Sequence, residues 1–180
     1  MTQAPTLYFD LGSPYAYLTV ARAAERFTLE PILLGAIFEW RGSGSWSQTP
    51  TRAENVVEVE ARARRYGLPP LVWPDGWPVN GLKAMRAATW AQARGALAPF
   101  ARAVYHREFA TGADISDPRV LARAAEEADL DPALLLAALD DPAIKQRLKD
   151  ATGAAWEAGV RGVPTVIDGD TVLYGDDAID

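Results

Sequence analysis

The tetrapeptide Ser13-Pro14-Tyr15-Ala16 comes one residue after an aromatic and aliphatic run, residues 7–11, that has the composition of a β-strand. Serine before proline signals the start of a helix, because the serine side chain accepts from a free backbone N–H and proline suits the first turn. A helix start carries about half a positive charge and several unpaired N–H groups, so it stabilises an anion. Ser13 is therefore the candidate catalytic residue; the alternative is that it only caps the helix.

The composition limits what else this chain can do. Its 180 residues include no cysteine and a single histidine, His106. The chain can therefore form no disulfide and carry out no thiol exchange with its own sulfur. A metal site built from cysteine thiolates or from several histidines is also excluded. We interpret His106 as structural and predict no bound metal. The net charge of −6 argues against nucleic acid and against an anionic membrane surface as partners.

Nothing in the sequence indicates a membrane or secreted protein. The longest apolar runs fall short of the roughly 20 residues that a membrane span needs. Residues 1–5 lack the basic and apolar regions of a signal peptide. The 49% of apolar residues can form a substantial core, and the richness in alanine and arginine is typical of a bacterial source. We expect a cytoplasmic protein.

The two ends of the chain have strand character. A helix over residues 14–27 and a buried strand over 31–34 complete a β-α-β unit, whose crossover should be right-handed. Near the other end, strands over 162–167 and 171–174 flank Asp168-Gly169, a two-residue hairpin signal. Because neither end has enough strands for a stable sheet, we expect both to join one sheet.

The long middle of the chain is helical. Apolar residues recur at helical spacing over three segments, residues 52–66, 82–94 and 96–110. Three later helices should each begin with an Asp-Pro pair, in which aspartate caps the helix and proline fills its first turn: Asp117-Pro118, Asp131-Pro132 and Asp141-Pro142. Residues 68–81 hold four prolines and two tryptophans and should form a loop.

Several segments together resemble a known family. Residues 8–18 look like the opening of 2-hydroxychromene-2-carboxylate isomerases and kappa-class glutathione transferases. Residues 78–86 are similar to a mid-chain pattern of the isomerases, 159–165 to their cis-proline segment, and 174–177 to their last glutathione contact. The resemblance implies an α/β fold of the DsbA-like, thioredoxin-like type, with a large all-helical insertion between the N-terminal β-α-β unit and the C-terminal β-hairpin.

This resemblance also implies a division of the chain. A discontinuous thioredoxin-like domain would comprise residues 1–35 and 160–180. The helical insertion would comprise residues 36–159, and its last helix would lead back into the thioredoxin-like domain. A homodimer is common among the resembling proteins.

Glutathione is the cofactor that the resemblance implies. Dithiol members of the fold carry Cys-x-x-Cys where this chain has Ser13-Pro14-Tyr15-Ala16, so the sulfur must come from outside. A helix start can lower a thiol pKa from ~8.5 to roughly 3.5–7.5. Ser13 would then donate its hydroxyl to the glutathione thiolate, while the protein supplies the electrostatics.

Further glutathione contacts are implied near the C-terminus. The Val163–Pro164 bond would be cis, and the backbone of Val163 would pair with the cysteinyl backbone of glutathione like an added strand. Asp176 and Asp177 would bind the γ-glutamyl ammonium group. The alternatives are a strand-entry proline at position 164 and two ordinary turn acids.

A second set of residues could contact an acceptor substrate: Tyr15, Trp73, Asn80 and Arg86. The alternatives are core packing for Trp73, a loop-fixing role for Asn80 and a surface position for Arg86. The resembling enzymes use an asparagine and a lysine of the insertion to hold glutathione. Residues 43–60 contain no lysine, so Asn55 or Arg52 is the candidate there.

The leading hypothesis is a glutathione-dependent isomerase of the 2-hydroxychromene-2-carboxylate isomerase type, acting on a small aromatic or unsaturated carbonyl compound. One alternative is a kappa-like glutathione S-transferase, which forms the same adduct without elimination. Another is a cysteine-free thioredoxin-fold module that binds an extended peptide without catalysis. A disulfide oxidoreductase is excluded because the chain has no cysteine.

Overall fold

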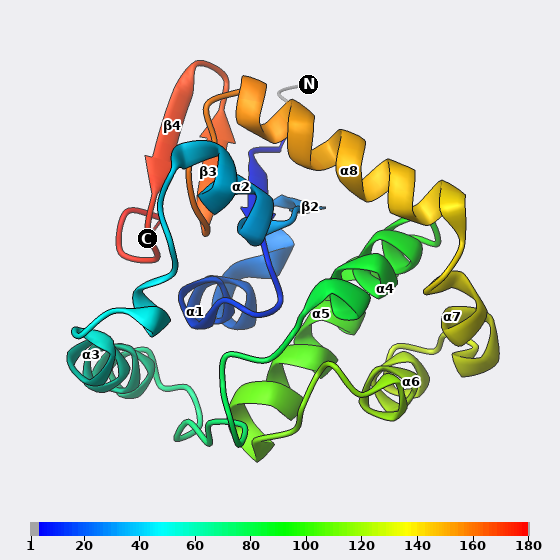
Figure 1. Ribbon diagram of the computed structural model, residues 1–180, viewed down its shortest axis with the longest axis horizontal. Helices are drawn as coiled ribbons and strands as arrows, with labels where there is room; N and C mark the ends of the chain where they lie inside the picture. Colours follow the sequence, from blue (N-terminus) through cyan, green and yellow to red (C-terminus); the bar gives the residue numbers. More distant parts are fainter. Residues whose placement is uncertain (1–3, 180) are drawn as a thin grey trace.

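A computed structural model describes residues 4–179 of the chain. Residues 1–3 and 180 lie outside the described residues. They belong to the predicted thioredoxin-like domain, and residues 1–3 also belong to the N-terminal segment that lacks the features of a signal peptide. A sheet occupies one side of the molecule and a group of helices the other, and the long helix α8 (Pro142–Glu157) runs along the edge of both (Figure 1). The predicted division into two domains stays a prediction.

The two ends of the chain build one four-stranded sheet in the order β2-β1-β3-β4. Strand β1 (Thr6–Phe9) pairs in parallel with β2 (Thr28–Pro31) and antiparallel with β3 (Thr165–Asp168), which pairs antiparallel with β4 (Thr171–Tyr174). The predicted single sheet is confirmed. Every described residue between β2 and β3 is helical or irregular, so the predicted all-helical insertion is confirmed as well.

Two strand details differ from prediction. The apolar run predicted as the second strand, residues 31–34, is buried at its start, but the ladder with β1 lies three residues earlier and ends at Pro31. Leu34 instead begins a helix, and its N–H donates to the Asp10 carboxylate at 2.8 Å. In the hairpin, Asp168 pairs with Thr171, so the two-residue loop is Gly169-Asp170, with Gly169 at a φ of 55°.

The helices follow the predicted segments closely. The α-helices of the described chain are α1 (Pro14–Ala23), α2 (Leu34–Arg41), α3 (Arg52–Arg65), α4 (Leu82–Gln92), α5 (Leu97–Tyr105), α6 (Pro118–Glu127), α7 (Pro132–Ala138) and α8. The described residues also form 3-10 turns at Ala24–Arg26 and Trp46–Gln48 and a π-helical turn at His106–Ala110. Asp117, Asp131 and Asp141 each accept from a backbone N–H in the following turn, which confirms the three predicted caps.

The predicted first helix is shorter than expected. It was expected to reach residue 27, but α1 ends at Ala23, and a 3-10 turn leads from it into β2. This early end follows from the sheet, because Thr28 donates to the carbonyl of Pro5 at 2.9 Å and must already be extended.

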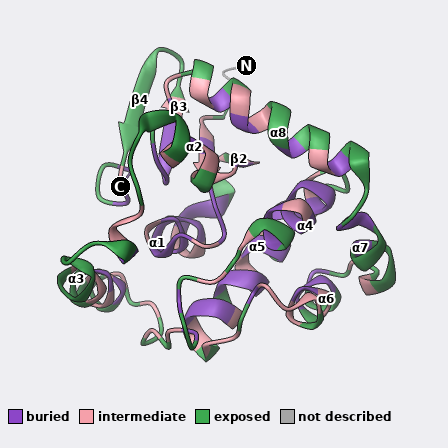
Figure 2. Ribbon diagram, viewed as in Figure 1, coloured by how far each residue is buried: buried purple, intermediate pink, exposed green. Residues whose placement is uncertain are grey.

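The core lies between the sheet and the helices behind it. Figure 2 shows α4 and α5 largely buried, whereas β4 at the outer edge of the sheet is exposed. Leu7 and Phe9 of β1 and Phe100 and Tyr105 of α5 are fully buried. Within residues 4–179, no helix is both long and apolar enough to cross a membrane.

The π-helical turn after α5 buries an acid. The Glu108 side chain is fully buried, and neither of its oxygens has a hydrogen-bond partner among the described residues. Burial, with the nearby carboxylates of Asp10 and Asp114 adding to it, raises the pKa of Glu108 well above its usual range. Burial therefore favours the protonated form of this carboxyl in the folded chain.

We expect Glu108 to make stability fall as the pH rises. Above the ordinary value of 4.5, the unfolded chain releases a proton that the folded chain retains, so stability is lost until the pH reaches the raised folded-state pKa. Glu108→Gln removes this titration. Between the unfolded-state and the folded-state pKa of Glu108, the free energy of unfolding of the native chain should fall relative to that of the variant by up to about 1.4 kcal/mol per pH unit.

The measurement is urea denaturation from about pH 5 to about pH 8. Glu126→Gln, at an exposed position of α6, serves as the control and should keep the pH slope of the native chain. A Glu108→Gln curve that stays parallel to the native curve would contradict the buried, protonated state of Glu108.

Candidate functional site

Ser13 both caps α1 and faces a cavity. It has extended backbone angles, its Oγ accepts from the N–H of Ala16 at 3.3 Å, and Pro14 occupies the first helical position. The side chain lines a cavity of about 310 Å³. Within residues 4–179, no acceptor takes the hydroxyl hydrogen of Ser13. The hydroxyl can therefore donate to an anion placed in the cavity.

Asp10 fixes the turn that presents Ser13. Its Oδ1 accepts from Gly12 N–H at 2.9 Å and its Oδ2 from Leu34 N–H at 2.8 Å. The backbone carbonyl of Asp10 accepts from Ser13 N–H at 3.0 Å and from the Tyr105 hydroxyl at 2.8 Å. Burial raises the pKa of Asp10, although its two backbone hydrogen bonds work in the opposite direction. One carboxylate oxygen is committed to the turn before α1 and the other to the start of α2, so Asp10 positions the site.

Val163 has an unpaired backbone and lines the same cavity. The Val163–Pro164 peptide bond is cis. Val163 lines the Ser13 cavity and lies just before β3. Neither its N–H nor its C=O has a hydrogen-bond partner in the part of the chain that the structure describes. Free backbone groups beside a cavity can pair with an extended peptide.

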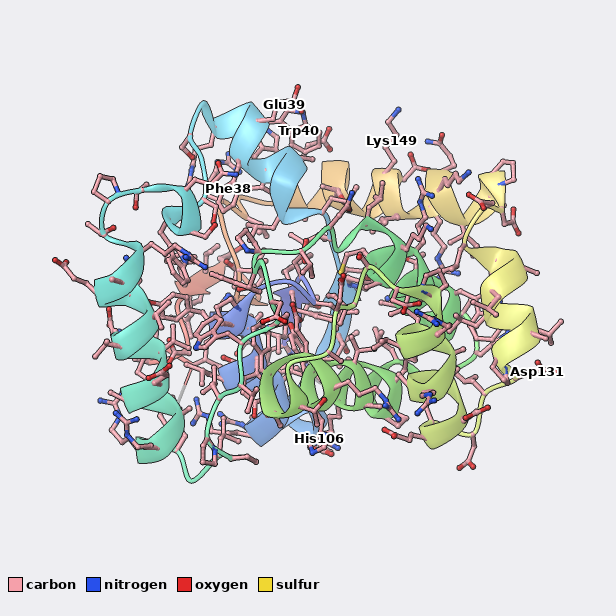
Figure 3. All side chains as sticks on the ribbon, turned by 60° about the horizontal axis from the view of Figure 1, so that its bottom comes forward. Phe38, Glu39, Trp40, His106, Asp131 and Lys149 are labelled. Atoms are coloured by element: carbon pink, nitrogen blue, oxygen red, sulfur yellow. The ribbon has the colours of Figure 1, made fainter. Side chains whose placement is uncertain are left out.

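The cavity beside Ser13 continues into a second one of about 360 Å³, and four residues line both: Tyr15, Trp46, Val163 and Tyr174. We call the two together the Ser13 cleft. A third cavity of about 430 Å³ adjoins the cleft across Leu34 and Phe38 and has mostly apolar walls; we call it the apolar cavity. In Figure 3, Glu39 of α2 points away from the molecule, whereas Phe38 lies on the inner side. The Trp40 ring packs against that of Trp156 of α8, with centroids 5.7 Å apart.

Asp176 and Asp177, which were predicted to act together, have different environments. The Asp176 side chain is 1% exposed; its Oδ1 lies 2.8 Å from Nη1 of Arg62, and its Oδ2 accepts from the Tyr66 hydroxyl at 2.8 Å. The Asp177 side chain is 60% exposed and lies 3.4 Å from the same Nη1. Both line the Ser13 cleft. Asp176 is held by partners within the protein, so Asp177 is the acid that remains available to a ligand.

Three further residues line the cleft: Trp46, Tyr174 and Arg62. Tyr174 belongs to the segment that resembles the last glutathione contact of the isomerases, whereas sequence reasoning missed Arg62. The i,i+4 spacing of Glu58 and Arg62 is typical of a solvated helical face, and the two side chains form an ion pair. The same guanidinium also reaches Asp176, and it lies over the Tyr15 ring at 5.6 Å. No local pattern indicates this, because the partners are more than 40 residues away along the chain.

Tyr15, one of the candidate acceptor residues, lines the cleft. Its hydroxyl donates to Asn55 Oδ1 at 3.5 Å, so Asn55 also lines the cleft. Burial and the charge of Glu58 raise the pKa of Tyr15 to about 12, partly offset by Arg62, and the phenol stays protonated at neutral pH. Arg52 instead donates to the carbonyl of Trp77 and lies outside the cleft.

The predicted acceptor residues do not all gather at Ser13. Asn80 lines the apolar cavity, and its Oδ1 accepts from Leu82 N–H at 3.0 Å. Trp73 packs against Trp77 with ring centroids 4.7 Å apart and borders neither the cleft nor the apolar cavity. Arg86 donates to the carbonyl of Leu139, on the side of α4 that faces α7.

His106 lies outside the site as well. It is exposed at the start of the π-helical turn, and its side chain points away from the molecule (Figure 3). Among residues 4–179, no three aspartate, glutamate or histidine side chains are grouped closely enough to hold a metal ion.

The chain is similar to known proteins over nearly its whole length. The model of the DSBA-like thioredoxin domain matches residues 6–180. The chain is 25% identical over 194 residues to 2-hydroxychromene-2-carboxylate isomerase of Sphingobium xenophagum, covering 100% of this chain and 96% of the relative. It is 26% identical over 196 residues to glutathione S-transferase kappa 1 of Rattus norvegicus, covering 97% of this chain and 86% of the relative.

A solved structure of a 2-hydroxychromene-2-carboxylate isomerase superposes with a TM-score of 0.88 at 24% identity, covering 97% of this chain and 90% of that one. This likeness confirms the thioredoxin-like fold that the sequence predicted. The family match, the full-length relatives and the shared architecture agree with one another. The chain belongs to the family of DSBA-like thioredoxin domains.

Proposed function

We propose that this chain is a glutathione-dependent isomerase of the 2-hydroxychromene-2-carboxylate isomerase type. The observation that carries the proposal is the Ser13 hydroxyl, which lies at the start of α1 in a cleft and has no acceptor for its hydrogen among the described residues. Two relatives that align over nearly the whole chain support it, because one is named as this isomerase and the other as a glutathione transferase.

The cleft suits glutathione in its charge and its backbone. The free N–H and C=O of Val163 match the cysteinyl backbone of a peptide that lies extended along the cleft. Asp177 would bind the γ-glutamyl ammonium, since its carboxylate is exposed while that of Asp176 is engaged by Arg62 and Tyr66. The sulfur would then lie beside Ser13.

The protein's own contribution is electrostatic. When bound, glutathione supplies a thiolate that adds reversibly to an unsaturated carbonyl compound and is eliminated after rotation about the former double bond. The first turn of α1 stabilises negative charge with its unpaired N–H groups. Ser13 adds a hydroxyl hydrogen bond, and Asp10 keeps the turn in place through Gly12 and Leu34.

The apolar cavity is the proposed acceptor site. It is walled by Leu33, Val79 and Met85, and Asn80 and Ser47 contribute polar groups. Mostly apolar walls with a few polar groups, and a volume of about 430 Å³, are typical of small-molecule sites. A small aromatic or unsaturated carbonyl compound would fit this lining.

Two alternatives use the same cleft. A transferase would release the adduct, so product mass separates the two enzymes: an isomerase leaves the acceptor mass unchanged, and a transferase adds glutathione to it. A peptide-binding module would rely on Val163 alone. Calorimetry with reduced glutathione tests it: no binding at millimolar glutathione, together with binding of an extended peptide, favours the module and contradicts the proposed function.

We expect Ser13→Ala to raise the thiol pKa of bound glutathione by about one to two units, because a hydrogen bond to a charged group contributes roughly 1.5–3 kcal/mol. The measurement is ultraviolet thiolate absorbance against pH with glutathione at saturation. Ser116→Ala, in the turn before α6 and outside the cleft, is the control. An unchanged midpoint in Ser13→Ala would exclude Ser13 as the stabilising donor.

The two neighbouring acids should respond differently to the same substitution. Asp177→Asn should weaken glutathione binding about tenfold or more, since it removes a charge-assisted contact, and change stability by less than about 0.5 kcal/mol. Asp176→Asn breaks a buried network and should lower the free energy of unfolding by about 2 kcal/mol or more.

Calorimetry with reduced glutathione and urea denaturation measure the two effects. Glutathione affinity that is unchanged in Asp177→Asn, or a stability loss as large as that of Asp176→Asn, would refute this assignment of roles.

A further inference from the structure

The two parts of the Ser13 cleft differ in charge. The part beside Asp177 contains Arg62, whose guanidinium is surrounded by carboxylates: Glu58, Asp176 and Asp177. Among the residues that the structure describes, the part beside Ser13 is lined by one cationic side chain, Arg41, and by no acidic one. A ligand that spans the cleft thus meets acids at one end and a lone arginine at the other.

Arg41 is held in place by neutral groups. It is the last residue of α2, and its Nε donates to Ser43 Oγ at 2.7 Å. Its Nη1 donates to the backbone carbonyl of Arg161 at 2.8 Å, and the guanidinium lies 5.4 Å from the centre of the Phe38 ring.

No carboxylate of residues 4–179 lies within 4.0 Å of the Arg41 guanidinium, and Nη2 donates no hydrogen bond to the described chain. The guanidinium is therefore positioned by its surroundings while its charge remains uncompensated. This differs from Arg62, whose charge is already balanced within the protein.

The direction of the bound peptide follows from the other contacts. With the γ-glutamyl ammonium at Asp177 and the cysteinyl residue between Val163 and Ser13, the third residue of the peptide must leave Val163 on the side away from Asp177. The residues that line the cleft there include Phe38, Arg41, Gly44, Thr49 and Thr51, of which Arg41 alone carries a charge. The third residue of glutathione is glycine, and it ends in a carboxylate.

We infer that Arg41 binds the glycine carboxylate of glutathione and makes the cleft selective for the tripeptide. This inference rests on the proposed function. Arginine suits the role because its planar guanidinium can donate two parallel hydrogen bonds to a carboxylate. Arg41 is the last residue of α2 and lies outside residues 43–60, the segment that holds the sequence candidates Arg52 and Asn55.

The test compares two ligands that differ only in the glycine, reduced glutathione and γ-glutamylcysteine. Calorimetry should show that the native chain binds glutathione about tenfold or more tightly than the dipeptide. Arg41→Gln should lose about tenfold in glutathione affinity, keep its affinity for the dipeptide and so lose the preference.

Arg94→Gln is the matched control. Arg94 is exposed, follows α4 closely and lies outside the cleft. Like Arg41, it donates to a backbone carbonyl, that of Trp90, and lies near an aromatic ring, 3.8 Å from the centre of the Trp90 ring. This variant should keep the native preference. Thermal unfolding of both variants checks that they are folded.

Three results would overturn the inference. Glutathione binding by Arg41→Gln that is as tight as that of the native chain would show that Arg41 makes no contact with the ligand. An equal loss for glutathione and the dipeptide would show that Arg41 only supports the shape of the cleft. Binding of neither ligand by the native chain would overturn the proposed function itself, and this inference with it.

Discussion

The Asp10 carboxylate joins the segments on which the whole site depends. One oxygen accepts from Gly12 and so shapes the turn into α1, and the other accepts from Leu34 at the start of α2. A side chain that is 9% exposed can carry a charge because both oxygens have partners. One acid thus sets the direction of the helix that presents Ser13 and of the helix that ends at Arg41. Tyr105 of α5 ties the same residue to the helical core through its carbonyl.

The absence of cysteine gives the site its chemical character. The start of α1 has the electrostatics that a thiolate needs, but the chain holds no sulfur to place there other than methionine. Val163 offers unpaired backbone groups beside Ser13, so a peptide that carries its own thiol would satisfy both features. The network of Arg62, Tyr66 and Asp176 fixes one end of the cleft against α3 and leaves Asp177 exposed.

Sequence reasoning succeeded where neighbours along the chain decide the outcome. Ser13 and the Asp-Pro pairs cap helices because the N–H groups they accept from lie two or three residues away. It failed where distant partners decide: the second strand lies three residues earlier than its apolar run because pairing with β1 sets the ladder. Asp176 and Asp177 look equivalent in the sequence, and only the position of Arg62 distinguishes them.

The central claim is that Ser13 stabilises a thiolate that glutathione brings to the cleft. A crystal structure of the chain with reduced glutathione tests it most directly. We expect the glutathione sulfur to lie within hydrogen-bonding distance of Ser13 Oγ, with the cysteinyl backbone paired to Val163. A sulfur that points away from Ser13, or glutathione bound outside the Ser13 cleft, would contradict it.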